Sequence, residues 1–138
     1  MGQQQLLLLV LGIVIVGLAV VVGIQAFSEN QEKANEDARV NDGVRIASDV
    51  QAWALKPAAF GGNGGTLATP DFADNLGYDE DANGDYANPN GVYDLGDITN
   101  GTMITATNPN GDAVYVLICG FDADDISTQV AGTAPTTC

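Results

Sequence analysis

An acidic stretch in the middle of the chain has the residue types and the spacing to bind a hard cation. Asp79, Asp81, Asn83 and Asp85 alternate along the chain, and Gly84 occupies the position of a sharp turn. They follow the pattern D-x-D-x-N-G-D, which opens a common type of calcium-binding loop. Alternating carboxylate and amide oxygens can converge on one Ca²⁺. The pattern predicts calcium as the one candidate cofactor.

The rest of this loop departs from the EF-hand pattern that it begins. Asn90 stands at the twelfth position, where a bidentate glutamate is expected, and no helix-forming segment flanks the loop. Asp94 or Asp97 could complete the ligand shell. A solvated acidic turn without an ion explains the same residues, and the sequence leaves both interpretations open.

Most enzyme chemistry lacks its usual residues in this chain. The 138 residues include no His and 2 Cys, so the commonest general base is missing and no four-ligand zinc or iron–sulfur site can be completed. The formal net charge is −14, and every charged residue after Lys56 is acidic. Such a surface repels phosphate. We therefore expect neither an enzyme nor a partner of nucleic acids.

The two cysteines, Cys119 and Cys138, lie late in the chain. Beyond a membrane, in an oxidising compartment, two such cysteines usually pair. The bond would close a loop of 18 intervening residues and would stabilise the fold by about 3 kcal/mol in the chain-entropy model. We expect a disulfide, with two free thiols as the alternative.

A membrane-length apolar segment lies near the N-terminus. Leu6–Ile24 contains nineteen residues with no polar side chain. As a helix it would span roughly 28 Å, close to the ~30 Å of a bilayer core. A secretory signal peptide would need basic residues before this segment and a small-residue cleavage site after it. Neither is present, whereas a plain single-span anchor stays open.

Helical character continues beyond the apolar segment. The first proline is Pro57, so we expect one helix of about 50 residues, roughly 75–80 Å long. Gly43 is the weak point of its second half. That half is expected to pack through a narrow apolar stripe of Phe27, Ala34, Ala38, Val44, Ala47 and Leu55.

The sequence divides into a helical domain, 1–56, and an acidic β head, 57–138. A glycine-rich loop should follow Pro57. Asp71–Gly96 is expected to be a long loop with one short strand at Gly91–Leu95. The aromatic residues expected in the core of the head are Trp53, Phe60, Tyr78, Tyr86, Tyr93, Tyr115 and Phe121.

The clearest hairpin joins Thr102–Thr107 to Asp112–Cys119 through the turn residues 108–111. The second of these strands is almost wholly apolar, so it should pack on the helix. Residues 120–138 are expected to add one more strand. The predicted fold class is therefore α+β, with the second half of the long helix packed on a small antiparallel sheet.

These elements, in this order, resemble a bacterial type IV pilin. In sequence the resemblance is specific for residues 1–56, where MGQQQLLLLVLGIVIVGLAVVVGIQAF is similar to the assembly helix of mature pilins. It implies that a basic leader is cleaved after a glycine and that the new first residue, here Met1, is N-methylated. Cleavage after Gly2 would be the alternative register.

One departure concerns Gln5, because the family usually has a glutamate there that pairs with the N-terminal amine of a neighbouring subunit. An amide can still accept a hydrogen bond, but the charge pairing is lost. Minor pilins and some pseudopilins also lack the glutamate. The remaining residues expected to act in assembly are Gly12, Gly17 and Gly23, where the helix can loosen or another backbone can approach, and Val14, an apolar position of the expected filament core.

The resemblance implies a structural subunit of an extracellular filament, a helical homopolymer joined through its apolar helices. Before assembly the subunit would be anchored in the inner membrane and would meet the pilus assembly machinery. The first alternative is a pseudopilin of a type II secretion system, which the acidic loop favours. The second is a membrane-anchored binding domain that never polymerises. Adhesion, motility, DNA uptake and conduction all stay open as uses of the filament.

Overall fold

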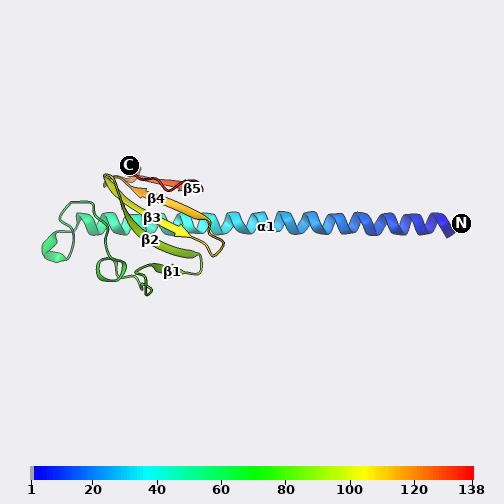
Figure 1. The fold of residues 1–138 in the computed structure, drawn as a ribbon, viewed down its shortest axis with the longest axis horizontal. Helices are drawn as coiled ribbons and strands as arrows, with labels where there is room; N and C mark the ends of the chain where they lie inside the picture. The colour runs from blue at the N-terminus through cyan, green and yellow to red at the C-terminus, as the bar shows by residue number, and fades with distance from the viewer. Residues whose placement is uncertain (1) are drawn as a thin grey trace. The chain divides into compact units, whose positions relative to one another are not determined.

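The fold of residues 2–138, described by a computed structural model, is a long helix followed by an antiparallel sheet (Figure 1). Helix α1 runs from Gly2 to Leu55. The α+β class predicted from the sequence is confirmed. The chain forms two compact units, an N-terminal unit, Met1–Asn35, and a C-terminal unit, Glu36–Cys138. The last part of α1 therefore belongs to the same unit as the sheet.

Helix α1 ends just before Pro57, as predicted, because proline cannot donate the next backbone hydrogen bond. The glycine-rich loop that follows turns back onto the helix end. Gly64 donates its backbone N–H to the carbonyl of Lys56 at 3.0 Å, and Gly65 donates to the carbonyl of Ala54 at 2.7 Å. These bonds satisfy carbonyl groups that a helix end otherwise leaves without partners.

Within the described residues the sheet has five strands in the order β1-β2-β3-β4-β5, and each strand is antiparallel to the next. The β3–β4 hairpin and a strand after residue 120 are confirmed. The strands are β1 (Tyr86–Asn88), β2 (Gly91–Ile98), β3 (Gly101–Thr107), β4 (Ala113–Ile118) and β5 (Ile126–Val130).

The stretch predicted as a long loop contains more regular structure than expected. The short strand predicted at Gly91–Leu95 extends to Ile98, and β1 precedes it. A turn of π-helix also forms at Phe72–Leu76. Strand β1 has only three residues, too few for a periodic signal in the sequence, and all three pair with β2 across the β1–β2 turn. Pairing of this kind depends on the partner strand, so local periodicity does not predict it.

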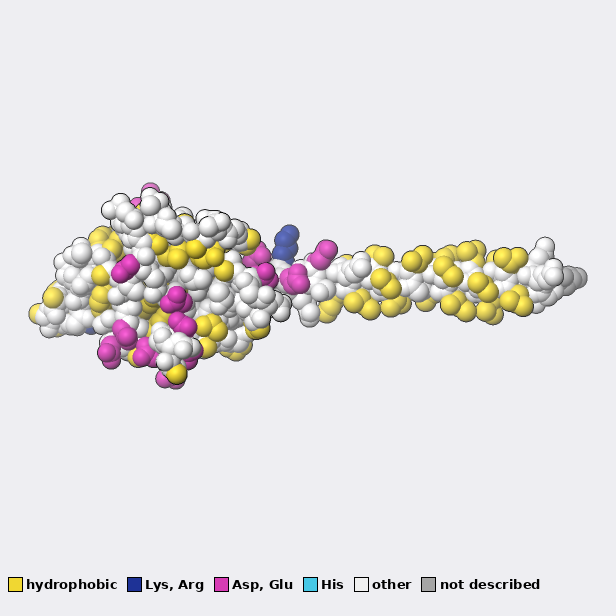
Figure 2. All heavy atoms as spheres, in the orientation of Figure 1, with side chains coloured by type: hydrophobic (Ala, Val, Ile, Leu, Met, Phe, Trp, Pro, Cys, Tyr) yellow, Lys and Arg dark blue, Asp and Glu magenta, His cyan; other side chains and the backbone are white. Residues whose placement is uncertain are grey.

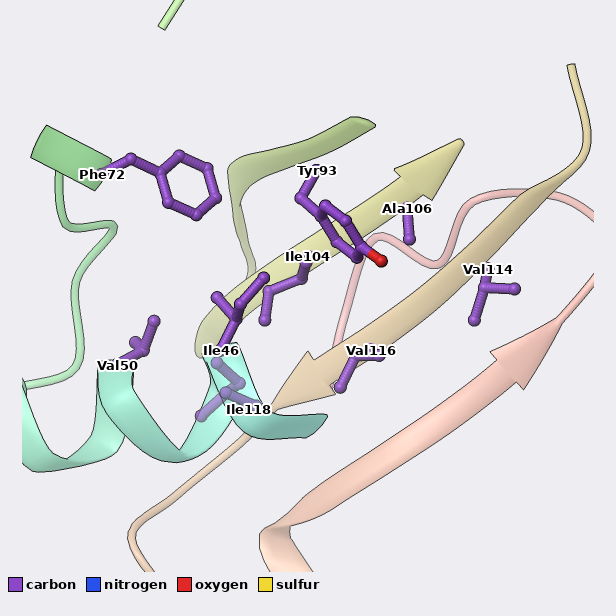
Figure 3. Packing of buried hydrophobic residues seen from close by; sticks show 10 residues of the cluster. Ile46, Val50, Phe72, Tyr93, Ile104, Ala106, Val114, Val116 and Ile118 are labelled. Atoms are coloured by element: carbon purple, nitrogen blue, oxygen red, sulfur yellow. The ribbon is translucent and has the colours of Figure 1, made fainter. Parts of the chain in front are cut away.

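The hydrophobic core lies between α1 and one face of the sheet (Figure 3). From the helix come Ile46, Ala47 and Val50, all almost fully buried. As predicted, β4 supplies a large share of the opposing surface. The core residues outside the helix are Phe72, Tyr93, Ile104, Ala106, Val114, Val116 and Ile118.

The predicted packing stripe of the helix is wrong in part. Phe27 is 65% exposed and Leu55 54% exposed, whereas Ala47 is buried. The sheet covers one side of the helix over its last turns, so the position of the strands selects the buried face. The helix residues that are buried are Arg39, Gly43, Ile46, Ala47, Val50 and Ala54.

The predicted aromatic core is confirmed in part, because Tyr93 lies in the core and Tyr78 and Tyr86 pack against it. Of the seven expected residues only Tyr93 is fully buried, and Phe60 is 72% exposed. Phe72, which the sequence analysis did not single out, is 1% exposed. Its ring lies 6.0 Å from that of Tyr78 and 5.9 Å from that of Tyr86. Tyr86 of β1 also contacts the rings of Tyr78 and Tyr93, so the aromatic cluster joins the π-helical turn to β1 and β2.

Gly43 is the point of closest approach between the helix and the sheet. A Cβ atom added there would lie 2.8 Å from Cγ2 of Val116 on β4, a separation that carbon atoms do not tolerate. The sequence analysis treated this glycine as a weak point of the helix. Glycine at this position lowers the helix propensity, but it also lets α1 pack more closely on β4.

The predicted disulfide between Cys119 and Cys138 is confirmed, with Cα atoms 5.5 Å apart. The terminal residues also form backbone hydrogen bonds with the β2–β3 turn. Thr99 donates to the carbonyl of Thr136 at 3.0 Å and accepts from the N–H of Cys138 at 3.2 Å. The disulfide and these bonds together hold the C-terminal segment on the sheet.

Replacing Gly43 with Leu is expected to lower the free energy of unfolding by about 1–3 kcal/mol, because the new side chain must displace Val116 or part the helix from the sheet. Thermal unfolding of the full chain in detergent, followed by near-ultraviolet circular dichroism, measures the change. Ser48→Leu adds a similar side chain at an exposed position of the same helix and serves as the control. Equal melting temperatures for the two variants would contradict this account of Gly43.

Candidate functional site

The first candidate site is the apolar surface of α1 in the N-terminal unit. From Leu6 to Ile24 every side chain is exposed, and no acid or base interrupts the surface (Figure 2). Exposure ranges from 50% at Val10 to 71% at Leu7. The helix is long and apolar enough to cross a membrane. Apolar surface of this extent is unfavourable in water and marks a site of contact with lipid or protein.

The residues predicted to act in assembly all lie exposed along this helix. A Cβ atom added at Gly12, Gly17 or Gly23 would meet nothing within 4 Å. The chain's own packing therefore does not require glycine at these positions. Gln5 and Val14 are exposed on the same helix, which continues unbroken through all three glycines. Met1, the predicted site of N-methylation, lies outside the described residues.

The second candidate site, the acidic loop, is organised around Asp81. One oxygen of its carboxylate accepts the backbone N–H groups of Asn83 at 2.8 Å and Asp85 at 3.1 Å. These bonds, the one from Asn83 first, lower the pKa of Asp81. Gly84 has φ of +88°, the left-handed conformation expected at the sharp turn. The Asp81 carboxylate thus stabilises its own turn.

The other predicted ligands of the acidic loop are differently placed. Burial and then the negative charges of Asp94 and Asp81 raise the pKa of Asp85, so these three carboxylates influence one another. Asn90 instead donates to Asp42, and Asp97 accepts from Thr69.

Asp79 is exposed beside the turn. Residues 2–138 contain no group of three or more acidic, His or Cys side chains arranged to hold a metal. Calcium binding stays a prediction from the sequence.

Sequence reasoning missed a polar cluster that joins the helix to the β1–β2 turn. One carboxylate oxygen of Asp42 accepts three hydrogen bonds, from Asn88 at 2.9 Å, Asn90 at 2.7 Å and the Tyr93 hydroxyl at 3.0 Å. Burial alone would raise the pKa of Asp42, but the three hydrogen bonds and the charge of Arg45 outweigh it, and the pKa is lowered. The cluster is a structural link between segments far apart in sequence.

A signal for this cluster existed in the turn sequence Asn88-Pro89-Asn90-Gly91, whose side-chain amides can bond to their own turn. Asn88 accepts the N–H groups of Asn90 and Gly91, at 2.9 and 3.1 Å. Beneath the same turn Arg39 is 3% exposed, and two of its guanidinium nitrogens find no hydrogen-bond partner among the described residues. Nothing local in the sequence predicted the burial of this charge.

Comparison of the chain with models of protein families, with curated proteins and with solved structures found no match in any of the three.

Asp42→Asn is expected to lower the free energy of unfolding at pH 7 by about 1–3 kcal/mol, since the amide cannot replace a carboxylate that accepts three donors. The folded-state pKa of Asp42 is below its ordinary value of 3.8. Its contribution is therefore present above that pH and is lost as the pH falls through the folded-state pKa.

The difference in melting temperature between wild type and Asp42→Asn should accordingly shrink as the pH is lowered below 3.8. Asp124→Asn removes an exposed carboxylate from the same unit and is the control. If the difference in melting temperature stays constant over the whole pH range, the charge of Asp42 does not stabilise the folded state.

Proposed function

We propose that the chain is a pilin, the structural subunit of a type IV pilus-like extracellular filament that polymerises through its apolar N-terminal helix. One observation carries the proposal: the charge-free helical segment from Leu6 to Ile24, exposed on all sides, in the same chain as a disulfide-bonded acidic unit. The resemblance of residues 1–56 to pilin assembly helices supports it.

The physical argument concerns the surroundings that this segment requires. An α-helix satisfies its backbone groups internally, so an apolar helix is stable in a bilayer. It leaves the bilayer only where an equally dry environment replaces the lipid, and a bundle of identical helices is such an environment. Repeated contact between unlike surfaces of identical subunits then gives a helical polymer. The acidic units would cover the filament and keep it soluble.

Electron microscopy of material sheared from intact cells tests the proposal, together with mass spectrometry of the filament peptides. Long filaments that yield an N-methylated Met1 peptide and a Cys119–Cys138 cross-link are expected. Short structures retained in the periplasm would favour the pseudopilin of a type II secretion system. Membrane-bound protein that forms no polymer would favour the other alternative, a membrane-anchored binding domain.

Two substitutions test the apolar helix as the filament core, and the second of them separates filament assembly from membrane anchoring. Val14→Asp is expected to abolish filaments, because an acid within the helix bundle costs about 2.5–3.5 kcal/mol per subunit at the centre of a membrane-like environment. Gly17→Leu should leave the protein in the membrane but reduce filaments about tenfold or more, because the neighbouring helix loses its close approach.

Val16→Leu, also an exposed apolar position of the same helix, is the control and should assemble normally. Normal filament yield from Val14→Asp would refute a filament core built from these helices. Filament yield is measured by electron microscopy and by immunoblots of the sheared fraction, and membrane content by fractionation.

A further inference from the structure

The exposed positive charges of the C-terminal unit gather in one place. This unit contains three bases, and Arg39 is buried, which leaves Arg45 and Lys56 as the exposed cations among its described residues. Both lie on α1 and line a pocket of about 460 Å³. The charged side chains visible elsewhere on this unit are mostly acidic (Figure 2). The pocket is therefore a positive site on an otherwise negative surface.

The pocket has fixed aromatic walls. The indole N–H of Trp53 donates to the carbonyl of Gly61 at 3.0 Å. The hydroxyl of Tyr78, which also lines the pocket, donates to the carboxylate of Asp49. Burial, followed by the hydrogen bond and the charge of Asp49, raises the pKa of Tyr78 to about 12, so this hydroxyl keeps its proton at neutral pH. The one acid that lines the pocket is thus already engaged.

Arg45 and Lys56 form no ion pair within the described part of the chain, although the unit is rich in acids. We propose that this pocket binds carboxylates of the acidic loop of a second copy of the chain, at Asp79 and Glu80. The proposal rests on the proposed function, because acidic units packed along a filament repel one another. An ion pair at the exposed cations would relieve that repulsion and would set the register between neighbours.

The choice of Asp79 and Glu80 follows from which acids beyond the helix are free and stand side by side. Asp122 and Asp125 bind each other's backbone in a capping box. Asp81 binds the N–H groups of its own turn.

Asp74 and Asp124 are also exposed, and their carboxylates accept no hydrogen bond within the described residues, but each stands without a free acid beside it. Asp79 and Glu80 are adjacent and exposed, and their carboxylates make no hydrogen bond in residues 2–138, so they form a pair that matches two cations. The pocket and this acidic pair are different surfaces, so the contact is heterologous and can repeat from one subunit to the next along a filament.

The test compares filaments of the full chain carrying Arg45→Glu or Lys56→Glu with wild type. Both variants should lower the yield of sheared filaments about tenfold. Lys33→Glu makes the same charge change at an exposed base outside the pocket and should resemble wild type. Thermal unfolding in detergent identifies variants with a folding defect. Of the two positions, Lys56 lies at the exposed end of the helix, so its substitution should disturb folding less.

A charge exchange identifies the occupant. In the Arg45→Glu/Lys56→Glu background, Asp79→Lys with Glu80→Lys should restore filaments to near wild-type yield. Yields unchanged by the pocket variants would overturn the proposal, and so would a loss that the exchange does not repair. If the pocket binds an acidic ligand of another kind, the pocket variants would assemble with unchanged filament yield. That ligand would bind wild-type filaments and would not bind filaments of the pocket variants. If wild type forms no filaments at all, the proposed function itself fails.

Discussion

The requirement for dry surroundings around Leu6–Ile24 constrains everything else in this chain. Within the helix the backbone hydrogen bonds are made internally, while every side chain of the segment is apolar and exposed. No single copy of the chain covers this surface with its own described residues. Lipid and a bundle of like helices meet the same physical need. A subunit with such a segment can move from one to the other without exposing it to water.

The C-terminal unit is held by a small number of contacts between segments distant in sequence. Ile46 and Val50 fill the space under the sheet, and Gly43 allows the helix to approach Val116 closely. The Asp42 carboxylate fixes the β1–β2 turn to the same helix face. The disulfide and two backbone hydrogen bonds hold the C-terminal segment at the β2–β3 turn. Apolar packing supplies the core, and these polar and covalent links determine its geometry.

Charge is distributed unevenly, and the distribution has consequences for self-association. Twelve acids follow Lys56 and no base does, so copies brought together repel at most of their surface. Arg39 is buried beneath the β1–β2 turn, so its positive charge is not exposed on the surface that meets another copy. The exposed cations, Arg45 and Lys56, share one pocket. In the filament we propose, this pocket would offer the acidic units one favoured position for attraction, and a regular polymer needs a single favoured position.

The sequence by itself determined the helix to Leu55, the β3–β4 hairpin and the cysteine pair, because apolar continuity, proline and turn residues act locally. It also located the apolar segment, because nineteen consecutive apolar residues are typical of a helix that contacts lipid or other helices. Only the tertiary structure decided which helix face is buried, where β1 forms and why Gly43 is glycine. The buried helix face and Gly43 depend on partners 40 or more residues away, such as Val116, and β1 depends on its pairing with β2. A contact between distant residues leaves no periodic trace in either segment.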